Sequence, residues 1–177
     1  QQKQQKQPEG ESAKQKTASP SGVEGNDTRT TVMLRSLPEG FTRDMLLDLL
    51  DSEGFDGTYD FVYLPINFKD GTSLGYAFVN LVSAVDARRF FRNFDGFSSS
   101  PDGAAAFTVS WSEPHQGIEQ QVERYRNSPV MHEDTPDKWK PVVFKDGVRI
   151  DFPPPTKLIK APKTRKTQTT KATPAST

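Results

Sequence analysis

Short apolar segments with regular spacing fill the middle of this chain and are absent from both ends. Thr30 to Leu37 is β-branched and apolar and is followed by Pro38, which is typical of a strand that ends there. Three further segments have the composition of strands: 58–64, 74–81 and 105–111. The apolar spacing therefore predicts four strands between residues 30 and 111.

Two segments between these strands have helical spacing. Thr42 can cap a helix that should end near Gly54, and its apolar stripe consists of Met45, Leu46, Leu49 and Leu50. Ser83 can cap a second helix whose sheet-facing residues are Ala84, Ala87, Phe90, Phe91 and Phe94. The order strand, helix, strand, strand, helix, strand predicts a ferredoxin-like α+β fold, a four-stranded antiparallel sheet with both helices on one face.

The other face of this sheet is expected to stay open and to carry aromatic rings. Side chains alternate along a strand, so Tyr76 and Phe78 share one surface while Ala77 and Val79 point to the other. Gly75 beside the rings suits the close approach of another backbone. Rings that the core does not need indicate a flat ligand, and nucleobases are the commonest one.

The segment 74–81 is similar to the octamer in the third strand of RNA recognition motifs (RRMs). Positions two to six fit, but Leu74 replaces a basic residue and Leu81 replaces an aromatic one. About forty residues upstream, 32–37 resembles the hexamer of the first RRM strand, with Met33 where a ring is usual. A methionine can lie against a base through its polarizable sulfur.

The open face is therefore the predicted RNA site. We expect its strands to contribute Met33, Arg35, Phe61, Tyr63, Tyr76 and Phe78, with Thr108 and Ser110 from the last strand. Two alternatives remain open. Tyr76 and Phe78 could be core residues beneath the C-terminal part of the chain, and Arg35 could pair with Asp60.

The sequence after residue 113 is too apolar for a free linker. Ile118, Val122 and Tyr125 recur at helical spacing, which predicts a third, docked helix over 116–127. A proline-interrupted segment follows and should pack onto the domain; its apolar residues are Trp139, Pro141, Val142, Val143, Phe144 and Ile150.

Four strings resemble one family specifically: 57–65, 74–80, 126–131 and 139–144. They look like the C-terminal RRM of the Mei-two-like family of meiosis regulators, and the likeness covers roughly residues 30–153. The resemblance implies RNA binding through this domain, a role in meiotic or developmental switching as part of a larger post-transcriptional regulator, and a location in the nucleus, the cytoplasm or both.

Composition sets the domain limits. Residues 1–29 are rich in Gln, Lys and Ser and predict a disordered lead-in, and 153–177 is a basic Pro, Lys and Thr-rich tail with only Leu158 and Ile159 as docking candidates. Between them we assign 30–113 to the RRM and 114–152 to the C-terminal helix and extension. Because the chain begins with Gln, we expect it to be part of a longer protein.

Charge is uneven although the whole chain is neutral. Residues 30–117 carry a net charge of −6 and residues 118–177 a net charge of +5. An acidic sheet domain opposes phosphate binding, so the tail should supply the attraction for RNA. Its predicted contacts are Lys157, Lys160, Lys163, Arg165 and Lys166. As alternatives, this tail could be a solvated charge run or a nuclear address.

Several classes of protein are disfavoured. The chain has no cysteine and two distant histidines, so we predict no disulfide, no metal site and no cofactor. No nucleophile is paired with a base, which argues against an enzyme. No apolar run is long enough to span a membrane, and we expect a soluble, intracellular monomer without a small-molecule substrate.

The rival function is a protein-interaction module that holds a peptide instead of RNA. An acidic domain suits a basic partner, and the position of the third helix discriminates between the two. Across the sheet, this helix would hide Tyr76 and Phe78 and favour a peptide partner or autoinhibition. Alongside the sheet, it would leave them open to RNA.

Overall fold

The computed structural model describes residues 26–99 and 105–163. Its helices begin where the capping residues predict. The Thr42 side chain accepts a hydrogen bond from Met45 N at the start of α1 (Arg43–Ser52), and the Ser83 side chain accepts one from Asp86 N at the start of α2 (Ala84–Phe94). The third helix, α3 (Ile118–Arg126), lies within the predicted range.

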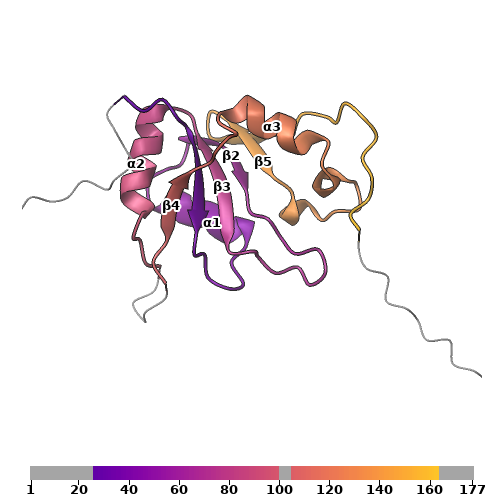
Figure 1. The fold of residues 1–177 in the computed structure, drawn as a ribbon, viewed down its shortest axis with the longest axis horizontal. Helices are drawn as coiled ribbons and strands as arrows, with labels where there is room; N and C mark the ends of the chain where they lie inside the picture. Colours follow the sequence, from indigo (N-terminus) through magenta and orange to yellow (C-terminus); the bar gives the residue numbers. More distant parts are fainter. Residues whose placement is uncertain (1–25, 100–104, 164–177) are drawn as a thin grey trace, which may run out of the picture.

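The strands pair antiparallel in one sheet of order β4-β1-β3-β2-β5-β6 (Figure 1). The four expected strands are β1 (Thr31–Arg35), β2 (Tyr59–Tyr63), β3 (Tyr76–Leu81) and β4 (Thr108–Trp111). The α+β RRM fold is thus confirmed. The sheet is wider than expected, because β5 (Val142–Lys145) and β6 (Val148–Ile150) form a hairpin that pairs with β2.

Two apolar clusters lie on opposite faces of the sheet. The helix side is covered by α1 and α2, where Phe55, Phe90 and Phe94 are fully buried. The other side carries a smaller cluster under α3, which lies at the β2 and β5 half of the molecule, far from α2 (Figure 1). The two helices therefore cover one face, as expected, and the third covers part of the other.

Gly75 allows the loop after β1 to approach β3. Its φ is +85°, a value that favours glycine, and its carbonyl accepts a hydrogen bond from Leu37 N at 3.0 Å. The close backbone expected at this glycine is therefore the protein's own loop.

The extension is held against α1 by one buried arginine. Arg43, with only 5% of its surface exposed, donates through Nη1 to the carbonyl oxygens of Asp137 and Lys140, at 2.6 and 2.8 Å. Asp137 begins the short helix η2 (Asp137–Trp139), and Lys140 follows its end. Arg43 thereby joins the start of α1 to both ends of this turn.

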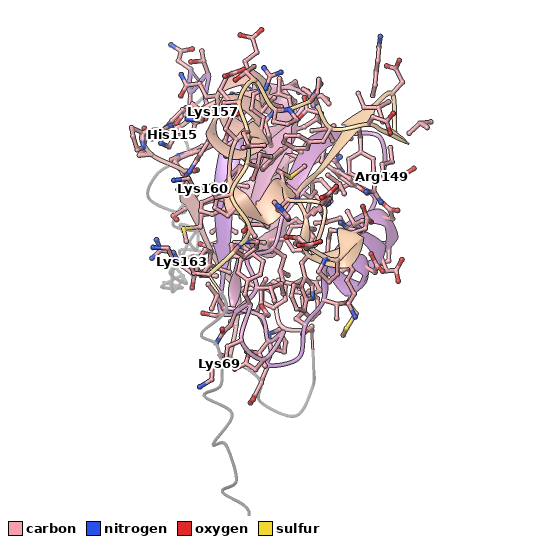
Figure 2. All side chains as sticks on the ribbon, turned by 90° about the vertical axis from the view of Figure 1, so that its right-hand side faces the viewer. Lys69, His115, Arg149, Lys157, Lys160 and Lys163 are labelled. Atoms are coloured by element: carbon pink, nitrogen blue, oxygen red, sulfur yellow. The ribbon has the colours of Figure 1, made fainter. Side chains whose placement is uncertain are left out.

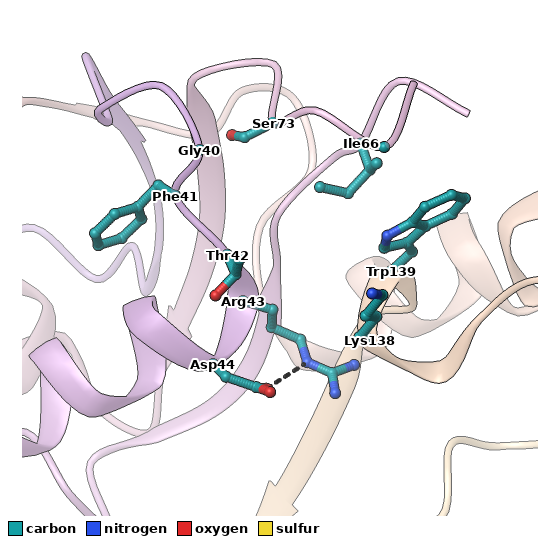
Figure 3. A pocket seen from close by; sticks show the side chains of 10 residues that line it. Gly40, Phe41, Thr42, Arg43, Asp44, Ile66, Ser73, Lys138 and Trp139 are labelled. Carbon is teal, nitrogen blue, oxygen red and sulfur yellow. Dashed lines mark ion pairs between the residues drawn. The ribbon is translucent and has the colours of Figure 1, made fainter. Parts of the chain in front are cut away.

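A cavity of about 170 Å³ marks the junction between the extension and the loops (Figure 3). Trp139 and Lys138 of η2 form one wall, Phe41 lies across from them, and the Arg43 side chain reaches toward Lys138. Gly71 fits closely here, because a Cβ at this position would lie 3.0 Å from the Trp139 ring. The extension thus packs against both the α1 start and the loop between β2 and β3.

We expect Asp137 to make this junction sensitive to acid. Hydrogen bonds from Arg149, and secondly from Arg43, lower the pKa of Asp137 to about 2. A depressed pKa means that the ionised carboxylate stabilises the folded state above about pH 4 and that this contribution is lost as the pH falls toward 2. Because the side chain is 63% exposed, solvent screening limits the contribution to about 1 kcal/mol.

Urea unfolding at several pH values checks this. Asp137→Asn should lower the free energy of unfolding by about 1 kcal/mol at pH 6, and roughly half of that difference should be gone at pH 3. A difference that stays constant from pH 6 to pH 3 would contradict the assignment.

Candidate nucleic-acid interface

Strand register arranges the α3-side face of the sheet in three rows. The lower row places Arg35 between Thr108 and Tyr76, and the middle row runs from Ser110 through Met33 and Phe78 to Tyr63. The upper row runs from Thr31 through Asn80 and Phe61 to Val143. All six predicted sheet residues share this face.

Half of this face is covered by α3. The Tyr125 ring stacks on Phe61, with centroids 5.9 Å apart and planes 19° apart, and it also contacts Tyr63 at 4.6 Å. Phe61 is completely buried, and Tyr63 and Phe78 are each 8% exposed. Burial raises the pKa of both Tyr63 and Tyr125, so both phenols stay neutral. These rings form a second core.

The expectation that Phe61, Tyr63 and Phe78 project from an open sheet is therefore wrong. The stripe of Ile118, Val122 and Tyr125, which predicted a docked helix, buries its apolar surface on these same rings. Of the alternatives left open, burial beneath the C-terminal part applies to Phe78 and not to Tyr76, which is only half-buried. The third helix lies across part of the sheet.

A bulge in β2 places these rings under α3. Tyr59 lies opposite Leu81 and Phe61 lies opposite Asn80, so the register shifts by one residue at Asp60. Tyr59 consequently packs on the helix side, where its hydroxyl donates to Asp51, while Phe61 packs on the α3 side. The bulge therefore sends Tyr59 and Phe61, two positions apart, to opposite faces of the sheet.

The carboxylate of Asp60 accepts a hydrogen bond from the Asn80 side chain at 2.7 Å, and burial raises the pKa of Asp60. Arg35 lies four residues further along the sheet, opposite Tyr76. Its guanidinium contacts the Met33 sulfur at 3.2 Å, and within the described ranges it makes no ion pair. The alternative pairing of Arg35 with Asp60 is therefore not formed.

The start of α3 is fixed to the start of β1. The Gln116 side chain accepts hydrogen bonds from Thr30 N and Thr31 N and donates to the carbonyls of Thr31 and Ser112. Gly117 N donates to the Thr31 hydroxyl at 2.8 Å. These contacts anchor the helix in its place over β2.

One corner of the face stays open. Arg35 and Thr108 are exposed, and Met33, Tyr76 and Ser110 are partly exposed. The corner thus combines an aromatic ring, a soft sulfur, a cation and two hydroxyls. A base can stack on the ring while the guanidinium and hydroxyls donate hydrogen bonds to its edge or to a phosphate.

Arg124 of α3 borders this corner. Its guanidinium lies 5.4 Å from the centre of the Phe78 ring, and the side chain is exposed. Tyr76 meets the same ring edge-on at 5.8 Å. A base could reach Phe78 only if Arg124 moved aside, so Tyr76 is the accessible ring.

The tail is ordered further than composition predicted. Arg126 donates two hydrogen bonds to Pro154 O, and the Asn127 side chain accepts hydrogen bonds from Thr156 N and Lys157 N. Lys157, Lys160 and Lys163 are all exposed, whereas Arg165 and Lys166 lie outside the described residues. At the other end, residues 1–25 of the predicted lead-in lie outside the described residues. Among those that follow, Arg29 forms ion pairs with Asp27 and Glu113.

Two other features bear on function. Within residues 26–99 and 105–163 no three His, Asp or Glu side chains gather where a metal ion could be held. No helix in the same ranges is both long and apolar enough to cross a membrane.

Comparison with known proteins gives a consistent result. Residues 29–102 match the model of the family RNA recognition motif 2. The domain belongs to this RRM family. The chain is also similar to MEI2-like proteins over a longer stretch than this match. MEI2-like 3 of Arabidopsis thaliana is 36% identical over 136 residues, and MEI2-like 2 of Oryza sativa subsp. japonica is 38% identical over 125 residues.

These alignments cover 74% and 68% of this chain but only 17% and 14% of the relatives. The chain thus spans less than a fifth of the proteins that it matches.

Solved RRM structures are similar in fold. The Sex-lethal RNA recognition domains 1 and 2 from Drosophila melanogaster are 26% identical, with a TM-score of 0.41 that covers 48% of this chain and 50% of that chain. The Rna15 RRM with bound RNA (GU) is 22% identical, with a TM-score of 0.40 that covers 54% of this chain and 95% of that chain. The fold assignment here rests on strand order and register.

Sequence reasoning missed three contributors around the RRM sheet. Arg124 and Arg126 lie in the last turn of α3, on either side of Tyr125, and Asn127 is the residue that caps the end of the helix. The sequence pointed to them only through their place in or next to a helix whose apolar spacing predicted that it packs against the sheet. The spacing could not say which residues of the sheet or the tail they would meet.

Proposed function

We propose that this RRM binds single-stranded RNA at the open corner formed by Met33, Arg35 and Tyr76. The observation that carries this is the exposed Arg35 lying directly between Tyr76 and Thr108, on the face of an RRM that α3 leaves uncovered. One base stacks on Tyr76, with the Met33 sulfur beside it, and Arg35 binds a base edge or phosphate.

Phe78, Phe61 and Tyr63 take an indirect part in this site. They form the floor that supports Tyr76 and the underside of α3. The proposed contact residues on the sheet are thus fewer than the sequence suggested, and Tyr76 is the ring that they offer to a base.

The regulatory setting is also part of the proposal. A larger protein that uses this RRM to select transcripts would act after transcription, in the nucleus or the cytoplasm. The support for a meiotic or developmental role is the similarity to MEI2-like proteins.

One observation favours the protein-interaction alternative. Phe78, the ring expected at the centre of an RNA platform, is hidden beneath the chain's own helix. A peptide held at the corner would use Tyr76 and Arg35 in the same way. RNA is preferred because the corner is cationic and polar rather than an apolar groove.

Titration with a pool of random single-stranded RNA tests the proposal, with the same pool annealed into duplex as the matched control. We expect saturable binding to the single strands and much weaker binding to the duplex, because stacked and paired bases cannot lie on Tyr76. Sequencing of the retained strands then gives the base preference. Absence of saturable binding to single strands, or equal binding to the duplex, contradicts the proposal.

A further inference from the structure

The segment from Phe152 to Lys163 crosses the molecule as a strap that is held at two places. Near its start, Arg126 binds Pro154 O and Asn127 binds the backbone of Thr156 and Lys157. Near its end, Pro162 and Ala161 line a cavity with Phe68 and Trp139. The strap is therefore attached to α3 and to the extension, although it contains no helix or strand.

The two partly buried side chains near the end of the strap lie three positions apart. Ile159 and Pro162 are partly buried, whereas Lys157, Lys160 and Lys163 are exposed. A repeat of three is the period of an extended polyproline-type chain, which places every third side chain on one side. Ile159 and Pro162 thus face the protein body, while the lysines and Leu158, which is 95% exposed, face water.

The three lysines lie on one side of the molecule. Figure 2 shows Lys157, Lys160 and Lys163 one below another, with His115 near the first and Lys69 beyond the last. Arg149 lies on the opposite side of this view, and it belongs to the helix side of the sheet because it pairs with Asp137, the partner of Arg43. The start of the strap is bonded to the end of α3, and its end lies by Phe68, which packs against the same apolar cluster as Tyr76.

This row is free to bind anions. Within the described ranges Lys157, Lys160 and Lys163 form no salt bridge, and six residues of extended chain span about 20 Å. Lys69, from the loop between β2 and β3, prolongs the row in Figure 2. The rest of the sheet domain is acidic, so this is where a polyanion meets least repulsion.

From these observations we infer that the strap is a second, sequence-independent RNA site: the phosphates of a strand that leaves the open corner run along Lys157, Lys160 and Lys163. This inference rests on the proposed function. It specifies the substrate as a single strand several nucleotides longer than the corner can hold, with a flexible backbone that can follow the strap.

The test compares oligonucleotides of about four and about ten nucleotides of the same base composition at several salt concentrations. Wild-type protein should bind the longer strand more tightly. The variant Lys157→Gln/Lys160→Gln/Lys163→Gln should lose roughly tenfold or more in affinity for the longer strand at low salt, and its salt slope should fall by about 2. Its affinity for the shorter strand should be nearly unchanged.

Two controls separate position from charge. Lys138→Gln/Lys140→Gln/Lys145→Gln removes the same charge from η2 and β5 and should leave the preference for the longer strand intact. Asn127→Ala keeps every lysine but removes the hydrogen bonds that hold Thr156 and Lys157. It should weaken long-strand binding by about threefold, because the backbone around Lys157 must then be ordered on binding. Asn93→Ala on α2 is its matched control.

The outcomes are distinguishable. If the strap-lysine variant keeps both its long-strand affinity and its salt slope, the strap site is overturned while binding at the corner stands. If Asn127→Ala has no effect while the lysine variant does, the lysines act as a loose tail and the anchored strap is overturned. If wild-type protein binds neither strand, the proposed function fails together with this inference.

Discussion

Replacing Tyr76 by Ala and Arg35 by Gln in the same protein should weaken binding of single-stranded RNA by about a hundredfold. A base stacked on an aromatic side chain contributes roughly 1–3 kcal/mol, and a hydrogen bond to a charged group contributes about 1.5–3 kcal/mol. Because the two contacts are neighbours and need not add fully, the expected loss is about 3 kcal/mol, or two orders of magnitude in Kd.

This pair of residues can be changed without removing the core. Arg35 is exposed and Tyr76 is half-buried, so the variant should remain folded. Phe78 is unsuitable for the same experiment, because at 8% exposure its loss would destabilise the fold as well as disturb the site. Fluorescence titration measures the affinity, and thermal unfolding verifies the fold.

The matched control is Val85→Ala with Arg92→Gln. Both residues are exposed on α2, on the far side of the sheet, and the double change removes one apolar group and one cation. This variant should bind RNA like the wild type. Wild-type affinity in the Tyr76 and Arg35 variant would exclude the corner as the site.

Phe61→Ala should lower the free energy of unfolding by about 3–5 kcal/mol, the usual cost of removing a buried aromatic ring. Phe61 has no exposed surface, and it lies between the Tyr125 ring and the sheet. The cavity left behind would also loosen α3, because Tyr125 would lose its stacking partner.

Urea unfolding followed by circular dichroism measures this effect. Val85→Ala serves again as the comparison, because at 64% exposure it should change stability by less than about 0.5 kcal/mol. A loss of less than about 1 kcal/mol in Phe61→Ala would show that α3 does not bury this ring in solution.

Local signals predicted the first part of the fold well. Thr42 and Ser83 cap α1 and α2 as their sequence context indicates, since a capping hydrogen bond depends only on residues three positions apart. The faces of β3, and of β2 from Phe61 to Tyr63, also followed from alternation, whereas the bulge that places Tyr59 on the helix side did not. What decides these features lies within a few residues of the chain.

Contacts distant in sequence decided what could not be predicted. The spacing of Ile118, Val122 and Tyr125 indicates that α3 docks, but its position depends on Gln116 bonding to Thr31, 85 residues earlier. The hairpin of β5 and β6 has a local signal in Asp146-Gly147, a two-residue turn whose φ values of 51° and 77° are both positive. Its place at the edge of the sheet depends instead on Val142 and Val143 pairing with β2. Burial of Phe61, Tyr63 and Phe78 follows from these two events together.

The packing of α3 on the sheet limits where a recombinant fragment of this protein can end. The family match ends at residue 102, before β4 and α3. A fragment that stops at residue 102 would lack the edge strand β4. A fragment that stops at residue 113 would expose Phe61, Tyr63 and Phe78 to solvent, because it lacks α3. The exposed apolar surface of such fragments would favour aggregation. A recombinant fragment should therefore include the chain through at least Phe152, which packs against the same cluster.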